Sequence, residues 1–261
     1  MNDGEHSKGR TIVLSDAHGF PELVSNALAH CAFSPASDAL VFAGDFIDRG
    51  PDPGGVLDAL TEAGAVMLLG NHDVALMMGG AMWLSDPESA PFRTPLLEGA
   101  LPDEGVPRWR IAWVVDGVLI THAGVSAAYQ RVFDVECGHD VSRLAARLNE
   151  DFVEASIEVL ATDGDPREHL VLGDEGPLWW RYVAGGTAPL KGCRQVFGHT
   201  PVEMLTRSDS SLRRMDLYGI DPYVYAFDAD NRPPAGRCKY AVIEGGEVTV
   251  VDVSGNDTDG R

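Results

Sequence analysis

The chain has 261 residues, 44% of them apolar, which is enough for one large folded domain with its own core. Its 40 acidic and 20 basic residues give a formal net charge of −20, which disfavours general binding to DNA or RNA because such a surface repels a phosphate backbone. The first ten residues hold no apolar run, and no stretch approaches the roughly 20 apolar residues of a membrane helix, so we expect a soluble, cytoplasmic protein without a signal peptide.

The first third of the chain alternates short apolar runs with helical patterns. Apolar runs at residues 11–15, 39–43 and 65–69 predict buried strands. Residues 21–31 and 55–63, which lie between these runs, carry apolar side chains at helical spacing. This alternation with short loops predicts βαβ units and a parallel sheet.

The rest of the chain is richer in strands. Residues 111–121 and 240–251 each contain two short apolar runs around a glycine-containing turn, which predicts two hairpins. The run at 194–197 predicts a further strand. Together these elements predict an α/β fold with two mixed β-sheets packed as a sandwich and helices outside.

Two segments look like helical inserts in what we expect to be a single domain over residues 11–253. Residues 79–107 are rich in proline, glycine and acids, and residues 140–162 predict one long amphipathic helix with an aspartate N-cap. Either insert could cover a ligand-binding face as a lid or serve only as packing decoration. We expect the termini, residues 1–10 and 254–261, to be disordered.

Polar side chains follow five of the predicted strands directly. A lone histidine after a strand is more often a hydrogen-bonded histidine than a ligand, but five such positions are hard to explain by packing. Ligands bind beyond the carboxyl ends of strands in α/β sheets, and oxygen and nitrogen donors suit Mn²⁺, Fe and Zn²⁺. The four cysteines are scattered, which disfavours a thiolate zinc site. The residues are Asp16, His18, Asp45, Asn71, His72, His122 and His199.

A centre of this kind suits phosphoester chemistry. Two metal ions about 3.5–4 Å apart need a bridging carboxylate, bind phosphate oxygens and lower the pKa of a bound water so that hydroxide attacks phosphorus. Arginines stabilise the charge on the equatorial oxygens, and a protonated histidine can give a proton to the leaving group. A phosphoesterase is therefore the function that the pattern favours.

The ordered series of motifs resembles the calcineurin-like metallophosphoesterases, in particular their bacterial phosphoprotein-phosphatase-like branch, which is related to diadenosine-tetraphosphate hydrolases. The resemblance implies the four-layer metallophosphoesterase fold. It covers residues 11–201, and the motifs read Ser-Asp-Ala-His-Gly at 15–19, Gly-Asp-Phe-Ile-Asp-Arg-Gly at 44–50, Gly-Asn-His-Asp at 70–73, His-Ala-Gly at 122–124 and Gly-His-Thr-Pro at 198–201.

The resemblance implies six ligands for two divalent or trivalent metal ions, with Mn²⁺ expected first and Fe or Zn²⁺ as alternatives. The ligands form two groups that share Asp45 as the bridge: Asp16 and His18 for the first ion, and Asn71, His122 and His199 for the second.

The resemblance also implies residues that act on the phosphate. His72 would be the general acid, or at least a phosphate-facing donor, oriented by Asp48. Arg49 would hold the phosphate, together with a second arginine. Arg181, which follows two tryptophans, resembles that element in bacterial members of the family. Arg194 is the competing candidate, and its alternative interpretation is a surface arginine beside a strand.

Departures from the family pattern bear on the substrate. Ser15 replaces the usual glycine, and the loop at 229–238 differs from the family's. Asp73 replaces the glutamate of most protein phosphatases and is typical of the tetraphosphate hydrolases, whereas the intact Asp48 and the lack of a visible Lys/Arg cluster for four phosphates favour a monoester.

We therefore expect a phosphatase that acts on phosphoserine and phosphothreonine in proteins, or on small phosphoesters. The alternative is a symmetrical dinucleotide polyphosphate hydrolase. A non-catalytic phosphate-binding regulator is disfavoured, since every metal-ligand position is filled by a competent residue. The expected partners are the phosphorylated substrates, with no DNA, RNA or membrane.

Overall fold

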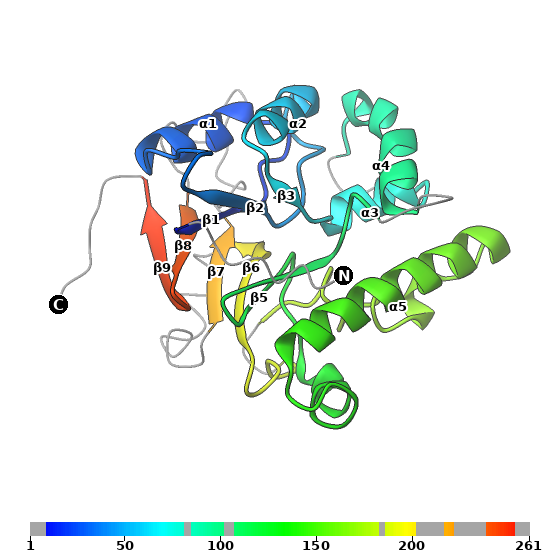
Figure 1. The fold of residues 1–261 in the computed structure, drawn as a ribbon. Helices are drawn as coiled ribbons and strands as arrows, with labels where there is room; N and C mark the ends of the chain where they lie inside the picture. The colour runs from blue at the N-terminus through cyan, green and yellow to red at the C-terminus, as the bar shows by residue number, and fades with distance from the viewer. Residues whose placement is uncertain are drawn as a thin grey trace.

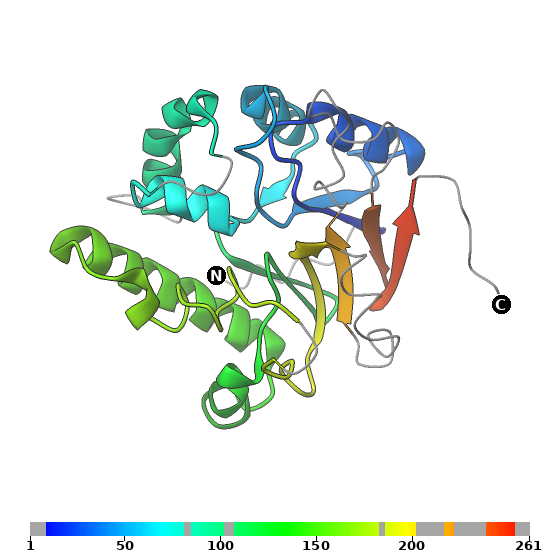
Figure 2. The ribbon, with the colours of Figure 1, turned by 180° about the vertical axis from the view of Figure 1, so that it is seen from behind.

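The computed structural model of the protein describes residues 9–80, 85–101, 107–182, 186–201, 217–221 and 239–253. Two mixed β-sheets form the centre, and helices cover their outer faces (Figures 1 and 2). The predicted architecture of two packed mixed sheets with helices outside is therefore confirmed.

The first sheet has five strands in the order β3-β2-β1-β8-β9. Strands β1 and β2 pair in parallel, as do β2 and β3, while β8 joins β1 in the antiparallel direction and forms the terminal hairpin with β9. The predicted parallel arrangement holds for the first three strands only. The strands are β1 (Thr11–Leu14), β2 (Ala39–Phe42), β3 (Val66–Met67), β8 (Lys239–Glu244) and β9 (Glu247–Asp252).

The second sheet has the order β4-β5-β6-β7, with β4 (Ala112–Val115), β5 (Val118–Thr121), β6 (Arg194–Pro201) and β7 (Leu217–Asp221). Its hairpin β4–β5 is the predicted one. The prediction ended β6 at residue 197, which is wrong, because β6 continues past a register shift and pairs again with β7. Strand β7 was not predicted, and its five residues include a glycine and end on an aspartate.

Five α-helices are described: α1 (Pro21–His30), α2 (Pro53–Glu62), α3 (Asn71–Met77), α4 (Arg93–Ala100) and α5 (Val141–Thr162). Helix α2 begins two residues earlier than predicted because Asp52 caps it, accepting a 2.7 Å hydrogen bond from the Gly55 amide. Asp140 is the N-cap of α5, as predicted. The remaining helical turns are Pro87–Phe92, Ala127–Tyr129, Pro166–Glu168 and the π-helical Val132–Glu136.

Successive side chains along the strands point to opposite faces of the sheet and so enter two different hydrophobic cores. In β1, Ile12 and Leu14 pack on the helix side, whereas Val13 lies in the core shared by the two sheets. Full burial of such a side chain contributes about 1.5–3 kcal/mol, so this period-two pattern fixes the strand faces and holds the sheets together. The shared core contains Val13, Val41, Ala43, Leu68, Val118, Ile120, Val196, Ala241 and Ile243.

The two helical inserts lie in different places. Helix α5 covers β4 and β5, where Asn149 Oδ1 accepts hydrogen bonds from the Ile111 and Ala112 amides at 2.9 and 3.1 Å. Helix α4, which lies within residues 79–107, packs beside α3 (Figure 1). The single-domain boundaries stay a prediction, and the termini 1–8 and 254–261 lie outside the described residues. Within the described part, no helix has the length and apolarity to cross a membrane.

Candidate metal centre and active site

The loops that follow β1 and β2 are tied to one another by their backbones. The Asp16 amide donates to the Gly44 carbonyl at 2.9 Å, and the His18 amide donates to the Asp45 carbonyl at 2.9 Å. Because the two strands are parallel neighbours, these bonds bring their carboxyl-end loops together.

Left-handed backbone geometry is concentrated in the same loops and recurs at His199 in β6. This conformation costs an L-residue about 1–2 kcal/mol, so packing and hydrogen bonds must hold it in place. Residues in sparsely populated backbone regions cluster at functional sites. The residues are Asp16 (φ 55°), His18 (φ 45°), Asp45 (φ 60°), Asp48 (φ 67°), Arg49 (φ 65°) and His199 (φ 63°).

The Asp45 carboxylate lies at the centre of the cluster. Its Oδ2 is 3.5 Å from His18 Nε2 and 3.4 Å from His122 Nε2, while its Oδ1 accepts a 2.9 Å hydrogen bond from the His72 amide. Ligand atoms of Asp16, Asp45 and His122 lie within 4.8 Å of one another, as do those of His18, Asp45 and His72. One carboxylate therefore lies between imidazoles that come from different sheets.

Backbone carbonyls orient two of the imidazoles. His18 Nδ1 is 2.9 Å from the Ile47 carbonyl, and His122 Nδ1 is 2.9 Å from the Ala43 carbonyl. A nitrogen that faces a carbonyl must carry the proton and donate it, so each Nε2 presents a lone pair to the cluster, which is the arrangement of metal-binding histidines. The Nε2 atoms of His18 and His199 are buried and have no hydrogen-bond partner among the described residues.

Asn71 adds a contact that calls for a cation. Its Oδ1 is 2.8 Å from His122 Nε2 and 3.1 Å from His199 Nδ1. Because His122 carries its proton on Nδ1, its Nε2 and Asn71 Oδ1 are both acceptors, and they face each other. Asp16, 2% exposed, has a pKa raised above its usual value, chiefly by burial and also by the nearby charge of Asp45, so its anion also lacks compensation. A bound metal ion would satisfy all of these groups, and the all-nitrogen-and-oxygen donor set fits Mn²⁺, Fe or Zn²⁺.

Burial lowers the pKa of two histidine ligand candidates, His18 and His199. The pKa of His18 is held well below its usual value by burial, and the nearby charge of Arg49 acts in the same direction. The pKa of His199 is likewise lowered by burial, with the charges of His122 and Arg181 adding to the effect. Neutral imidazole is the form that binds metal, so the site is prepared for ions without a proton having to leave these rings.

His72 has different partners from the ligand candidates. Its Nδ1 is 2.7 Å from Asp48 Oδ2, and its Nε2 is 3.0 Å from a terminal nitrogen of Arg49. Burial acts to raise the pKa of Asp48, but hydrogen bonds and charge, chiefly those of His72, outweigh it and hold that pKa below the usual value. The arrangement is an ionised carboxylate that orients an imidazole beside the metal cluster.

The two arginine candidates lie at different distances from the cluster. Arg181 is close enough to His199 for its charge to lower the pKa of that imidazole. Arg194 is in register with Val118, at the start of β5, and donates to the carbonyl of Gly246 in the β8–β9 turn. Arg181 therefore lies near the cluster, and Arg194 does not.

Residues 9–218 match the calcineurin-like phosphoesterases, a family named Metallophos. The chain belongs to this family. Members of this family are hydrolases of phosphoric esters that use divalent metal ions. The predicted family and enzyme class are confirmed.

Named relatives point to two kinds of phosphoesterase. A symmetrical bis(5'-nucleosyl)-tetraphosphatase of Edwardsiella ictaluri is 31% identical over 145 residues, which are 52% of this chain and 51% of the relative. Serine/threonine-protein phosphatase 1 of Salmonella typhimurium is 43% identical over 61 residues, 23% of this chain and 28% of the relative. The chain thus spans about half the length, or less, of these relatives.

A solved structure shares the fold. The cold-active protein-tyrosine phosphatase of a psychrophile, Shewanella sp., aligns with a TM-score of 0.60 at 16% identity, covering 94% of this chain and 80% of that one. At this identity the likeness supports the fold alone.

Two residues of the metallophosphoesterase site, Asp73 and Trp179, were not predicted as site residues from the sequence. Asp73 is fully buried and accepts hydrogen bonds from the Asp45 and Gly70 amides, both at 2.8 Å. Its place three residues after the helix-capping Gly70 could have indicated this role. Trp179 packs edge-on against His199, with ring centroids 6.3 Å apart, and no local sequence signal places it there.

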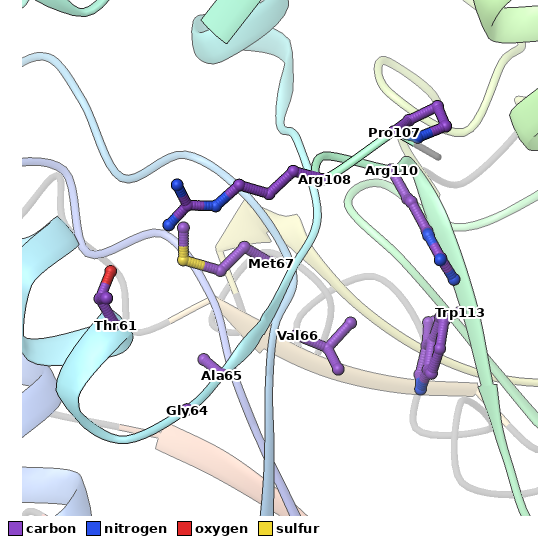
Figure 3. Close-up of a pocket in the computed structure, with 9 residues that line it drawn as sticks. All are labelled: Thr61, Gly64, Ala65, Val66, Met67, Pro107, Arg108, Arg110 and Trp113. Carbon is purple, nitrogen blue, oxygen red and sulfur yellow. The ribbon is translucent and has the colours of Figure 1, made fainter. Parts of the chain in front are cut away.

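A separate cavity of about 410 Å³ opens at the edge of β3 (Figure 3). Its lining includes Arg108, Arg110, Val66 and Trp113 but no carboxylate or imidazole. The cavity is therefore distinct from the metal cluster and lacks the groups for the proposed chemistry.

Proposed function

We propose that the protein hydrolyses phosphate monoesters, with phosphoserine and phosphothreonine in proteins or small phosphoesters as substrates. The observation that carries the proposal is the Asp48–His72 pair beside the cluster, since protonation of an alkoxide leaving group needs an oriented acid. The substrates would be the partners of the protein, and neither nucleic acid nor membrane is expected. Its cytoplasmic location stays a prediction.

Two metal ions, with Mn²⁺ expected first, would supply an activated water and positive charge for the phosphate oxygens. We assign Asp16 and His18 to the first ion and Asp45 to both. The assignment is supported by the central position of the Asp45 carboxylate between His18 and His122.

The second ion would take Asn71, His122 and His199 together with Asp45. The support is the pair of acceptors that Asn71 and His122 present to each other, and the buried Nε2 of His199 without a partner in the described part of the chain. Metal identity follows availability as well as affinity, so it is a matter for measurement.

His72 would act as the general acid. Asp48 holds its Nδ1 and would stabilise the charged imidazolium, which leaves Nε2 to face the leaving group. Arg49 now contacts that Nε2, and an arriving phosphate would offer its guanidinium stronger, charge-assisted hydrogen bonds. Arg181 would stabilise phosphate charge from the side of His199.

The second candidate function is symmetrical hydrolysis of dinucleotide tetraphosphates. It is favoured by the tetraphosphatase relative, whose alignment covers 52% of this chain, against 23% for the serine/threonine phosphatase. The aspartate at position 73 is weaker support for the tetraphosphatase function than its residue type suggests. Its carboxylate accepts hydrogen bonds from the backbone amides of Asp45 and Gly70, which is a structural role.

The deciding experiment is a parallel assay of the full chain with Mn²⁺ on a phosphothreonine peptide, p-nitrophenyl phosphate and diadenosine tetraphosphate. We expect the monoesters to have the higher kcat/KM. A strong preference for the dinucleotide would replace the first proposal with the second. A protein that retains metal and binds phosphate but turns over none of the three would be a non-catalytic regulator.

A further inference from the structure

The carboxylate of Asp48 is held from outside the family motifs. Ser89 Oγ accepts a 2.9 Å hydrogen bond from the Asp48 amide, and the Asp86 amide donates to Asp48 Oδ1 at 3.2 Å. The Ser85 hydroxyl makes a longer contact of 3.4 Å with Oδ2, the oxygen that also bonds His72. All three groups come from one turn, residues 85–89, which lies 37 to 41 positions further along the chain.

Ser89 supplies a hydrogen-bond acceptor that the buried backbone amide of Asp48 requires. Asp48 is in the left-handed backbone region, with φ at 67°, and is only 3% exposed, so its amide cannot be solvated by water. Ser89 is 1% exposed and supplies the acceptor. Its hydroxyl also contributes to holding the pKa of Asp48 down, although less than His72 does. One serine therefore supports both the backbone and the charge of Asp48.

The turn is capped at its start and packs on other elements at its end. At its start, the Asp86 carboxylate accepts from the Glu88 amide at 2.9 Å. At its end, the chain enters α4, which packs on α3, the helix that begins with the His72 motif. Phe92, in the helical turn that includes Ser89, meets Phe46 edge-on with centroids 5.9 Å apart. Residues 85–89 are thus attached to the elements that carry Asp48 and His72, which is more than surface decoration requires.

We propose that residues 85–89 position the acid of the reaction: Ser89 and, to a smaller extent, Ser85 fix Asp48, and Asp48 fixes His72. This inference rests on the proposed function, because it assigns a task to the proposed acid. Neither serine touches the substrate in this scheme. Both act through Asp48, so their effect should follow the need for a proton at the leaving oxygen.

The test uses Ser89→Ala with two monoesters. The phenolate that leaves phenyl phosphate is a strong base and needs a proton from the acid. The p-nitrophenolate that leaves p-nitrophenyl phosphate is a weak base and does not. We expect kcat for phenyl phosphate to fall about 10-fold, the scale for loss of an outer supporting hydrogen bond, and kcat for p-nitrophenyl phosphate to fall far less. Metal content should be unchanged. Ser85→Ala should show the same selectivity with a smaller loss.

Ser156→Ala is the matched control, since Ser156 is a fully buried serine on α5 whose hydroxyl has no hydrogen-bond partner in the described structure. It should leave both activities unchanged. A second control is Ser89→Ala added to His72→Asn. If Ser89 acts through His72, the added change has no further effect on phenyl phosphate turnover, as expected for residues in one chain of contacts.

Equal losses for the two monoesters, or full additivity with His72→Asn, would overturn the inference and leave Ser89 as a structural residue. If Ser89→Ala does not fold, Ser85→Ala decides, because Ser85 is exposed; an unselective Ser85→Ala then overturns it. Failure of the proposed function would look different, since the wild-type protein with Mn²⁺ would then hydrolyse neither monoester or would strongly prefer diadenosine tetraphosphate.

Discussion

Asp45 Oδ2, from the first sheet, lies 3.4 Å from Nε2 of His122, from the second sheet. The candidate metal centre therefore joins the two halves of the sandwich. Its ligands would be dispersed in the unfolded chain, so metal binding should be coupled to the stability of the whole fold.

Removal of metal should lower the melting temperature. A ligand present at a thousand times its Kd stabilises the folded state by about 4 kcal/mol, which corresponds to roughly 10 °C for a chain of this size. We expect that shift between samples with excess Mn²⁺ and with EDTA, measured by calorimetry. Equal melting temperatures would show that no metal binds the folded protein preferentially.

Asp45→Asn should weaken both metal sites, because one carboxylate oxygen faces His18 and His122 together. We expect the metal content, measured by elemental analysis after dialysis, to fall well below two ions per chain. Turnover should fall about 100-fold or more. Loss of a single ion with the other retained would contradict the bridging assignment.

His72→Asn should keep the metals and lose turnover. Both ring nitrogens of His72 face Asp48 and Arg49, and general acid catalysis contributes about 10²–10⁴-fold. The loss should be greatest for poor leaving groups such as phenyl phosphate. If elemental analysis showed that metal was lost with the imidazole, the role as acid would be wrong.

Gly70→Ala should disturb the centre without removing any ligand. A methyl group at Gly70 would lie 2.1 Å from Asp45 Oδ1, so the carboxylate would have to move. We expect weaker Mn²⁺ binding in a calorimetric titration. Gly54→Ala is the control, since a methyl there is 3.6 Å from its nearest neighbour and the site is helical, where alanine is favoured. Wild-type metal affinity in Gly70→Ala would count against the central place of Asp45.

The Arg10–Asp38 ion pair predicts a stability effect that depends on pH. The hydrogen bond from Arg10, at 3.1 Å, lowers the pKa of Asp38. A carboxyl whose pKa is lower in the folded than in the unfolded state stabilises the fold at pH values above its unfolded pKa, near 4. This stabilisation is lost as the pH falls through the lower, folded-state pKa. Asp38→Asn should therefore lower the melting temperature by about 2–4 °C at pH 7, on the scale of up to 1 kcal/mol for such pairs. The difference should shrink below about pH 4, and a constant difference would exclude the ion pair as its cause.

The ligand candidates could be read from the sequence because each lies next to a short apolar strand. Parallel neighbours bring their carboxyl ends to one edge of a sheet, so local patterns in β1, β2 and β3 already predicted that Asp16, Asp45 and Asn71 would meet there. The capping aspartate of α5 was readable for the same reason, since an N-cap is made within a few residues.

The remaining features depend on contacts between distant residues. Strand β7 was missed because its pairing with β6 and not its own sequence makes it a strand. Ser89 contacts Asp48 although the two residues are 41 positions apart in the sequence. The sequence around Arg181 and Arg194 does not indicate which of the two lies near His199. Local chemistry along the chain thus determined the family, the reaction class and the set of ligand candidates. The packing of one sheet on the other, and of α4 on α3, decided which of these side chains meet, because only burial between elements brings groups with no sequence relationship within hydrogen-bond distance.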